Sequence, residues 1–576
     1  MRTRRRRILD GSLLVLGIVA IVVLVTRYGM PFRMDDVLYM QWAIHHPFTD
    51  SFSTTAGELF MSFRPVMAMT FWLLTHLAGP DRYWIWHTLL VGAYFTAIAF
   101  TGLTARYICE RISALPISAV AYWLAFLPIL NVLFWFADLT YALEMMFCSA
   151  AWYFGIRALD EFRTSFWVTA NIIGVIAVMT KEPSLLLIHG VFLGMVIFRR
   201  RRIQRGLKPL STNGRILWAA SYGLFALVSL VMFFSSNATS TRFFHFGEIP
   251  RETLHFLMMD RLRYYSDTLA TTPFVVFVSL GIVGLIVADS ARTVRKSAVI
   301  ATIFSVLILV CWVVYKPLLL LTILLAAPLF AIQGGNRGSR RVLIVPFGAI
   351  AIVNSLVLLI TMMLVKTQLA ELSFLLTLIA SVGVASLVGV ISERLLVTSS
   401  LRIGATIGIV IAAIGATIFL LPKLRSKEAL LCDVRSSRLH ANQAIRLMAH
   451  QLPQSSTVAV TTPALIGLRS EDELTSTSDD YKVYAQHSFQ QGFVRAYFQV
   501  LGRPDLHLAY LADSTTLPRT LDSLRSARDH YLFLETGLDV DLAHGKRNGR
   551  NWFNGRDSLL ARFDDGGFAS EVWKLR

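Results

Sequence analysis

Residues 2–28, RTRRRRILDGSLLVLGIVAIVVLVTRY, place a cluster of arginines directly before a long apolar run. The apolar part, Ile8 to Thr26, is long enough to cross the hydrocarbon core of a bilayer as one helix. A basic cluster before an apolar run also resembles a signal peptide, but no A-x-A-like cleavage site follows this run. We therefore interpret it as an uncleaved first span whose arginines lie on the cytoplasmic side.

Similar apolar runs continue through most of the chain. Hydrophobic residues make up 55% of it and charged residues 16%, with a mean hydropathy of +0.56, which excludes an ordinary soluble protein. Runs of about 17 to 25 residues each predict one crossing, which gives about thirteen transmembrane helices. The runs begin near Ile8, Tyr83, Ala114, Tyr141, Phe166, Ser184, Ile216, Pro273, Ala298, Pro317, Val342, Leu372 and Ile403, and the last one ends near Pro422.

The positive charges alternate between the two sides of these runs. A net charge of +18 would suggest a nucleic-acid partner in a soluble protein, but here the basic residues gather in every second connection, as membrane topology requires. We therefore expect no nucleic acid partner, a cytoplasmic N-terminus and an extracytoplasmic C-terminal region. We expect the protein to reside in a bacterial inner membrane. The clusters are Arg106 with Arg111, Arg157 with Arg163, Arg199 to Lys208, Arg292 to Lys296, Arg337 to Arg341, and Arg394 with Arg402.

The pattern divides the chain into two domains. Residues 1–422 are expected to form the transmembrane domain, with a long first outer loop over residues 27–82. Within that loop, Val37 to His45 and Val66 to Leu77 are amphipathic and predict short helices in the membrane interface. Residues 423–576 have an ordinary polar composition and predict a small extracytoplasmic α/β domain.

Five segments support this second domain. Two have helical periodicity and three alternate or run apolar as strands do. The expected helices are Ser437 to Leu452 and Leu517 to Ser526, and the expected strands are Thr457 to Thr461, Leu506 to Leu511 and His530 to Glu535.

Ionisable residues gather at the predicted outer ends of the spans. Charged groups near the hydrocarbon are costly and need a reason, so this gathering marks a candidate site. The residues concerned are Asp35, Asp36, Arg64, His87, Asp138, Lys181, Glu182 and Lys316.

The order of the motifs around these residues resembles the GT-C superfamily of membrane glycosyltransferases. Protein O-mannosyltransferases and tetratricopeptide-linked relatives open the first outer loop with an acidic pair, followed by Arg-Pro and later by Lys-Glu at a span end. The span count with an outer C-terminal domain is similar to that of bacterial aminoarabinose transferases acting on lipid A. The motifs here are Met34-Asp35-Asp36-Val37-Leu38-Tyr39, Phe63-Arg64-Pro65, Trp86-His87, Ala137-Asp138-Leu139 and Met179-Thr180-Lys181-Glu182-Pro183.

This chain also departs from those relatives. It lacks the longer pattern around the acidic pair, has Ala137-Asp138 where tetratricopeptide-linked enzymes carry Gly-Arg-Ala-Asp, and has no repeat domain. The motif resemblance covers about the first third of the chain, residues 1–200. The acceptor, whether lipid, glycan or protein, therefore does not transfer from any one subfamily.

The resemblance implies sugar transfer from a polyprenyl-phosphate donor at the outer membrane face, with inversion at the anomeric carbon. Asp35 is then the base that deprotonates the acceptor, and Asp36 orients the acceptor, raises the basicity of Asp35 by like-charge repulsion, or ligates a divalent cation. No other cofactor is implied. The donor phosphate is expected at Arg64, Lys181 and Lys316, with Glu182 holding Lys181, and with Asp138 and His87 in supporting positions.

Other interpretations of the same residues remain open. Asp35 and Asp36 also suit a solvated cap on an interfacial helix that begins at Val37, and Lys181 with Glu182 suits a snorkelling anchor with its ion-pair partner. For the whole chain, the rival function is a transporter or a flippase for lipid or lipid-linked sugar. Such proteins often have two related halves with broken helices at the midplane, and we find no internal repeat here. A non-catalytic scaffold would leave the clustered charges unexplained.

Overall fold

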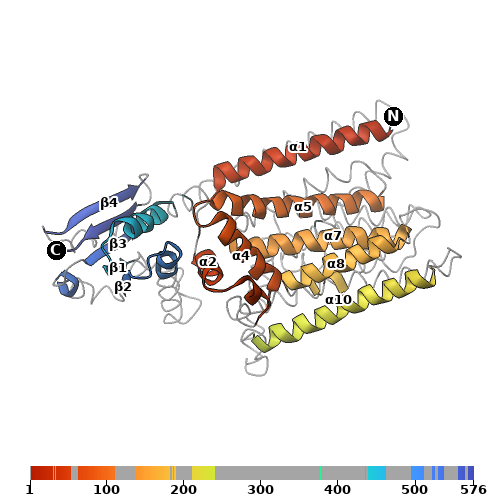
Figure 1. Ribbon diagram of the computed structural model, residues 1–576. Coiled ribbons are helices and arrows are strands. Elements are labelled where there is room, and N and C mark those ends of the chain that lie inside the picture. Colours follow the sequence, from red (N-terminus) through yellow and green to blue (C-terminus); the bar gives the residue numbers. More distant parts are fainter. Residues whose placement is uncertain are drawn as a thin grey trace, which may run out of the picture.

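The computed structural model describes two parts of the molecule, a bundle of long helices and a sheet with short helices at one end of that bundle (Figure 1). The structure describes residues 2–29, 32, 34–53, 63–109, 136–161, 163–181, 184–185, 187–189, 211–239, 377, 435, 439–461, 494–510, 522–525, 530–536, 556–564 and 569–576.

The long helices coincide with predicted spans. Helix α7 packs between α5 and α8, while α1 lies against α5 and α10 lies against α8 (Figure 1). Helices thus form at the runs predicted near Ile8, Tyr83, Tyr141, Phe166 and Ile216. Only residues 184–185 and 187–189 of the run near Ser184 are described, and the runs near Ala114 and from Pro273 onward lie outside the described residues except for Thr377. The bounds are α1 (Arg2–Tyr28), α5 (Tyr83–Cys109), α7 (Leu139–Glu161), α8 (Thr164–Thr180) and α10 (Thr212–Thr239).

The outward faces of these helices are apolar. By length and composition, Tyr83–Ile108 and Thr212–Met232 are each able to cross a membrane, and α1 and α8 contain shorter apolar stretches. Large apolar side chains such as Leu16 on α1 and Leu227 on α10 are more than half exposed. Water would penalise such a surface and lipid would not, so the helices are those of an integral membrane protein.

Close contacts between aromatic and small residues join α8 to α10. The rings of Trp167 and Trp218 stack with centroids 4.3 Å apart, and the Trp167 indole donates to the Trp218 carbonyl over 3.0 Å. A Cβ at Gly174 would lie 3.2 Å from the Phe225 ring, so glycine permits this close approach.

Two shorter helices lie across the end of the bundle that faces the sheet (Figure 1). They are α2 (Met34–His45) and α4 (Pro65–Ala78), joined in part by the 3-10 turn η1 (Phe48–Phe52), and they occupy the segments predicted as interfacial helices. Proline is well placed at the start of α4, where the backbone N–H has no helical partner anyway. We call this end of the bundle the α2–α4 end.

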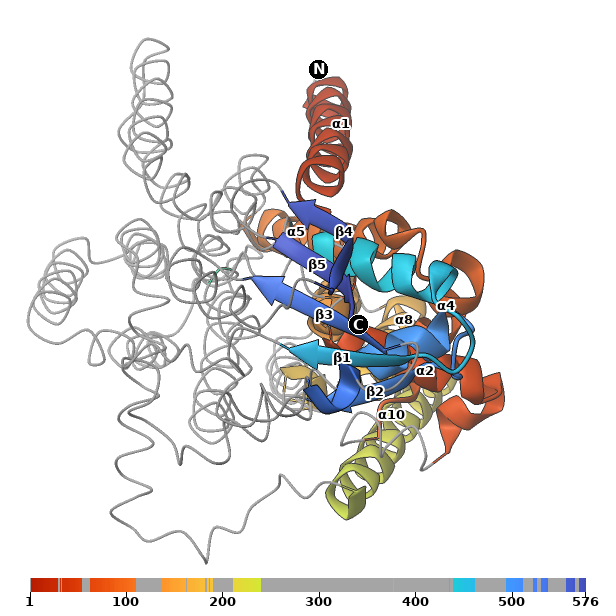
Figure 2. The same cartoon turned by 90° about the vertical axis from the view of Figure 1, so that its left-hand side faces the viewer.

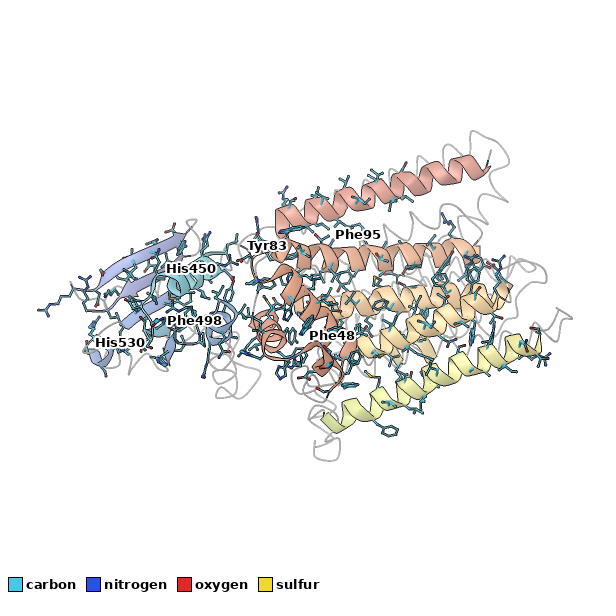
Figure 3. The ribbon with its side chains drawn as sticks, in the orientation of Figure 1. Phe48, Tyr83, Phe95, His450, Phe498 and His530 are labelled. Atoms are coloured by element: carbon cyan, nitrogen blue, oxygen red, sulfur yellow. The ribbon has the colours of Figure 1, made fainter. Side chains whose placement is uncertain are left out.

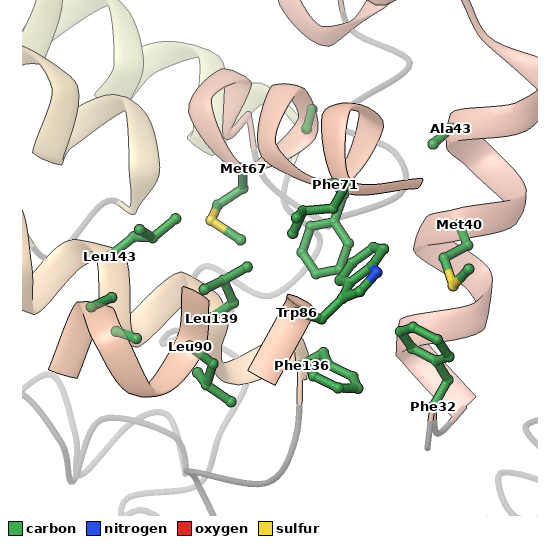
Figure 4. Close-up of a cluster of buried hydrophobic side chains, with 14 of the residues drawn as sticks. Phe32, Met40, Ala43, Met67, Phe71, Trp86, Leu90, Phe136, Leu139 and Leu143 are labelled. Atoms are coloured by element: carbon green, nitrogen blue, oxygen red, sulfur yellow. The ribbon is translucent and has the colours of Figure 1, made fainter. Parts of the chain in front are cut away.

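A buried aromatic cluster fixes α2 and α4 to the long helices. Phe32 before α2 and Phe136, in the 3-10 turn η3 (Phe136–Asp138), both pack against Trp86 of α5, with ring centroids 5.1 and 5.8 Å away. Phe71 of α4 approaches Trp86 from another side, and Met67 of α4 points toward the start of α7 (Figure 4). Each of these side chains is almost completely buried.

The C-terminal part contains a five-stranded sheet in the order β2-β1-β3-β5-β4 (Figure 2). Strand β1 pairs in parallel with β2 and β3, whereas β5 pairs antiparallel with β3 and β4. The first three strands lie where the sequence predicted strands; β4 and β5 were not predicted. The bounds are β1 (Thr457–Thr461), β2 (His507–Tyr510), β3 (His530–Thr536), β4 (Ser558–Asp564) and β5 (Ala569–Lys574).

Two helices of the C-terminal part, at 439–451 and 494–500, lie between this sheet and the bundle. Their buried side chains, among them Ile445 and Tyr497, belong to one apolar cluster that also contains Phe32, Met40 and Trp86 at the α2–α4 end. The hydrophobic core is therefore continuous across the junction of the two parts.

Candidate functional site

Lys181 ends α8 at the α2–α4 end of the bundle. Its backbone is extended, with φ −160° and ψ 141°, and its N–H still donates to the Ala177 carbonyl over 3.0 Å. The residue is only 3% exposed, so its side chain is not a snorkelling anchor that reaches outward. The long side chain instead turns into the protein.

A carboxylate on the neighbouring helix faces the Lys181 ammonium. Glu144 of α7 is completely buried, and its Oε2 lies 3.8 Å from Lys181 Nζ. The hydroxyl of Ser184, just beyond Lys181 in the chain, donates to the other carboxylate oxygen over 2.9 Å. Nζ also lies 2.9 Å from the centroid of the Tyr141 ring, whose π face attracts a cation.

This arrangement is energetically costly. Removing a carboxylate and an ammonium from water costs several kcal/mol each, and mutual attraction repays that only with good geometry and further hydrogen bonds. Here the ions are 3.8 Å apart, at the long end of ion-pair distances. A pair of apolar side chains would pack there at less cost, so stability alone does not account for Glu144 and Lys181.

Three more of the predicted site residues are buried around η3. Asp36 and His87 are 0% exposed and Asp138 is 7% exposed. The turn η3, which ends in Asp138, contacts α2, α5 and α7, and the His87 ring meets the Phe136 ring edge-on at 4.5 Å. Asp138 directly precedes α7, and Glu144 lies about 7.5 Å along that helix from its first residue, Leu139, at about 1.5 Å of rise per residue.

The interpretation of the acidic pair as a solvated helix cap is wrong for Asp36. Helix α2 begins at Met34, before the pair, so both aspartates lie in its first turn, where carboxylates favour the positive end of the helix dipole. Asp36 is buried, and only the backbone of Asp35 is described. The position of the Asp35 carboxylate therefore remains a prediction.

Of the other predicted site residues, the structure describes Arg64. Arg64 is half-buried directly before α4, where its carbonyl accepts the Ala68 N–H over 3.0 Å. Helix α4 contacts α8, which carries Lys181 at its end. Glu182 and Lys316 lie outside the described residues, so the roles expected of them stay predictions. Among the described residues, Glu144 faces the Lys181 ammonium.

Sequence reasoning missed Glu144, although a signal for it was present. The residue lies inside the apolar run LTYALEMMFC, and an acidic residue within a span marks a candidate functional site by itself. Glu144 lies within the predicted span and not at its end, where the other candidate residues lie. Ser184 carried no comparable signal, because a serine directly after a proline is ordinary at the start of a predicted span.

The expectation of a metal ion at Asp36 finds no further support. In the described part of the chain, no group of three His, Cys, Asp or Glu side chains is arranged to hold a metal ion. A cation at Asp36 therefore stays a prediction from the resemblance.

No protein-family model and no curated protein matches the chain. Two crystal structures of ArnT from Cupriavidus metallidurans are similar to it over nearly the whole length. The structure bound to undecaprenyl phosphate is 13% identical, with 97% of this chain and 98% of that chain covered and a TM-score of 0.32. The apo structure is 12% identical, with 98% of both chains covered and the same TM-score. At this low similarity, function has to be argued from the residues themselves.

Proposed function

We propose that this protein is a GT-C-type glycosyltransferase that moves one sugar from a polyprenyl-phosphate donor to an acceptor at the extracytoplasmic membrane face. The acceptor is a lipid, a glycan or a protein. The observation that carries the proposal is the buried Lys181–Glu144 pair, which lies at the same end of the bundle as Asp36, His87 and Asp138. A lysine held in a dry site is suited to receive a phosphate at the membrane surface.

The reaction is a single displacement. Asp35 takes the proton of the acceptor hydroxyl or amine, and the acceptor lone pair attacks the anomeric carbon from the face opposite the phosphate. The bond between that carbon and the phosphate oxygen breaks, and its electron pair leaves with polyprenyl phosphate. The anomeric configuration is therefore inverted and no covalent sugar–enzyme intermediate forms.

The cationic residues stabilise the charge that develops on the leaving phosphate. Lys181 supplies a point charge, Arg64 a fork suited to two phosphate oxygens, and Lys316 a further charge. His87 and Asp138 support this arrangement from α5 and η3. Asp36 orients the acceptor or holds a divalent cation.

The remaining parts of the proposal concern topology. About thirteen spans in residues 1–422 form the catalytic domain. Residues 423–576 form an extracytoplasmic domain, and the protein resides in a bacterial inner membrane with a cytoplasmic N-terminus. The clustering of Arg157, Arg163 and Tyr107 around Glu161, at the end of the bundle away from α2 and α4, agrees with this orientation.

The test is sugar transfer by the purified chain in lipid nanodiscs, with a panel of radiolabelled polyprenyl-phosphate sugars. Donor cleavage and donor binding are measured side by side for the native chain, for Asp35→Asn and for the matched control Asp50→Asn in the same loop. We expect Asp35→Asn to lose cleavage by about 10³-fold while binding survives. The control should retain both. If the native chain binds or moves the lipid without cleaving the sugar–phosphate bond, a transporter replaces the enzyme.

A further inference from the structure

Four side chains of the C-terminal part reach across the junction and bind the segments that carry the candidate site. They are Arg435, Asn442, Arg446 and Gln499, and we call them the junction clamp. Figure 3 shows side chains from both parts filling this junction beside Tyr83, the first residue of α5.

The first contacts hold the connection between α1 and α2. Arg435 Nε donates to the Gly29 carbonyl over 3.0 Å, and Asn442 Nδ2 donates to the Phe32 carbonyl over 3.4 Å. The last carbonyls of a helix have no partner within it, so the arginine supplies one at the end of α1. A Cβ at Gly29 would lie 2.4 Å from the Val25 carbonyl oxygen, so this close helix end requires glycine.

The second contacts hold α2 itself and the turn before α5. The Gln41 side chain of α2 hydrogen-bonds to Gln499. Arg446 donates to the Pro80 carbonyl over 3.0 Å and forms an ion pair with Asp81 over 2.8 Å.

The guanidinium of Arg446 lies beside a buried tyrosine, Tyr497. Tyr497 is 0% exposed, and burial raises the pKa of its hydroxyl, an effect that the neighbouring charge of Arg446 partly offsets. A neutral phenol beside the guanidinium helps to direct the arginine toward the 80–81 turn instead of toward solvent.

These contacts bear on two elements of the site. The connection held by Arg435 and Asn442 leads directly into the first turn of α2, with Asp35 and Asp36. The turn held by Arg446 leads into the start of α5, whose fifth residue is His87. No group of the clamp belongs to the candidate site itself.

We infer that the C-terminal part is a positioning element, whose junction clamp fixes the start of α2 and of α5 so that the acidic pair and His87 keep their places. The clamp is thus a structural requirement for the acceptor step, and the C-terminal part need not bind the acceptor. The catalytic consequence rests on the proposed function, whereas the ordering of α2 and α5 does not.

The experiment uses the full chain in nanodiscs and compares Arg446→Gln, Arg435→Gln and the conservative Arg446→Lys with the native chain. Arg562→Gln is the matched control, because Arg562 is an ion-paired arginine of the same C-terminal part whose ion-pair partners among the described residues, Asp564 and Glu571, lie on β4 and β5. Backbone hydrogen exchange is followed in peptides covering 29–42 and 79–87. We expect it to become about tenfold faster in both glutamine variants, which corresponds to about 1.4 kcal/mol of lost local stability.

Two further measurements separate positioning from general damage. Exchange in Thr164–Thr180 of α8 should not change, and kcat should fall with the KM for the donor retained. Arg446→Lys should restore part of both effects. Unchanged exchange in both segments, or a rise in the acceptor KM as the sole effect, would overturn the inference. If the native chain transfers no sugar, the proposed function fails while the exchange data still decide whether the clamp exists.

Discussion

Both ends of the α7–α8 pair carry a glutamate beside basic side chains, yet the two ends bury them very differently. At one end, Glu161 is 21% exposed and pairs with Arg157 at 2.8 Å and with the mostly exposed Arg163 at 3.3 Å. At the α2–α4 end, Glu144 and Lys181 are almost completely buried at a separation of 3.8 Å. The first pairs are of the kind that membrane topology produces and water solvates.

The difference separates topology from function. An exposed ion pair contributes little and costs little, so its presence needs no special reason. A buried pair costs several kcal/mol to desolvate and is retained where the charge is needed. Charge alone therefore does not identify the site in this chain; buried charge at one end of the bundle does.

The largest effect is expected from removing the buried cation. Lys181→Met should lower sugar transfer by about 10²- to 10³-fold, because the leaving phosphate loses a fixed positive charge. Arg163→Met at the other end is the matched control and should transfer at close to the native rate. Initial rates of transfer with the radiolabelled donor measure both variants. Equal losses in the two variants would show that the buried cation is no more important for transfer than the exposed one.

The carboxylate of the buried pair should matter chiefly for stability. Glu144→Gln leaves the Lys181 ammonium buried without its counter-charge, at a cost of about 3 kcal/mol. In the double variant with Lys181→Met, much of that cost should disappear, since no buried charge is left over. Unfolding in mixed micelles gives the four free energies of the cycle. Strict additivity of the two single changes would show that the pair is not coupled.

The glutamate at the opposite end should contribute much less. Glu161→Gln is expected to cost at most about 1 kcal/mol, because Arg157 and Arg163 remain partly solvated after the change. The same unfolding assay compares it with Glu144→Gln. A cost as large as that of Glu144→Gln would mean that burial does not set the energetic difference between the two ends.

A partly exposed pair in the C-terminal part, Arg503 with Asp505, extends the comparison. The Asp505 carboxylate accepts hydrogen bonds from Arg503, at 2.8 Å, and from the Ser455 N–H, and these hold its pKa well below the usual range. The ionised Asp505 carboxylate therefore stabilises the folded state fully above the unfolded pKa of about 4. This contribution is lost as the pH falls through the lower pKa of the folded state.

The corresponding measurement is unfolding of the native chain and of Asp505→Asn as a function of pH. The native chain should be slightly more stable above about pH 4, and the difference should shrink in more acidic solution. A difference that grows toward acid would contradict the assigned direction of the shift.

The long helices of the described residues follow from the sequence alone, whereas the short helix at 494–500 was not predicted. Apolar runs such as those of α5 and α10 have to satisfy their backbone inside the segment, so composition determines helix and length without tertiary information. The same holds for β1 and β3, whose short apolar runs are typical of buried strands. Strands β4 and β5 were not predicted. Strand β4 is largely exposed and pairs antiparallel at the sheet edge, which weakens its apolar pattern.

The partners of the charged residues were decided only by tertiary structure. The sequence indicated Lys181 as a candidate and its chain neighbour Glu182 as a partner; Glu182 lies outside the described residues, and Glu144 on the adjacent helix, which the sequence did not indicate, faces the ammonium. Likewise, no pattern in residues 435–499 predicts that they hold the starts of α2 and α5. Side-chain periodicity reports what each element buries, while the identity of the facing residue depends on how helices pack against one another, which local sequence does not encode.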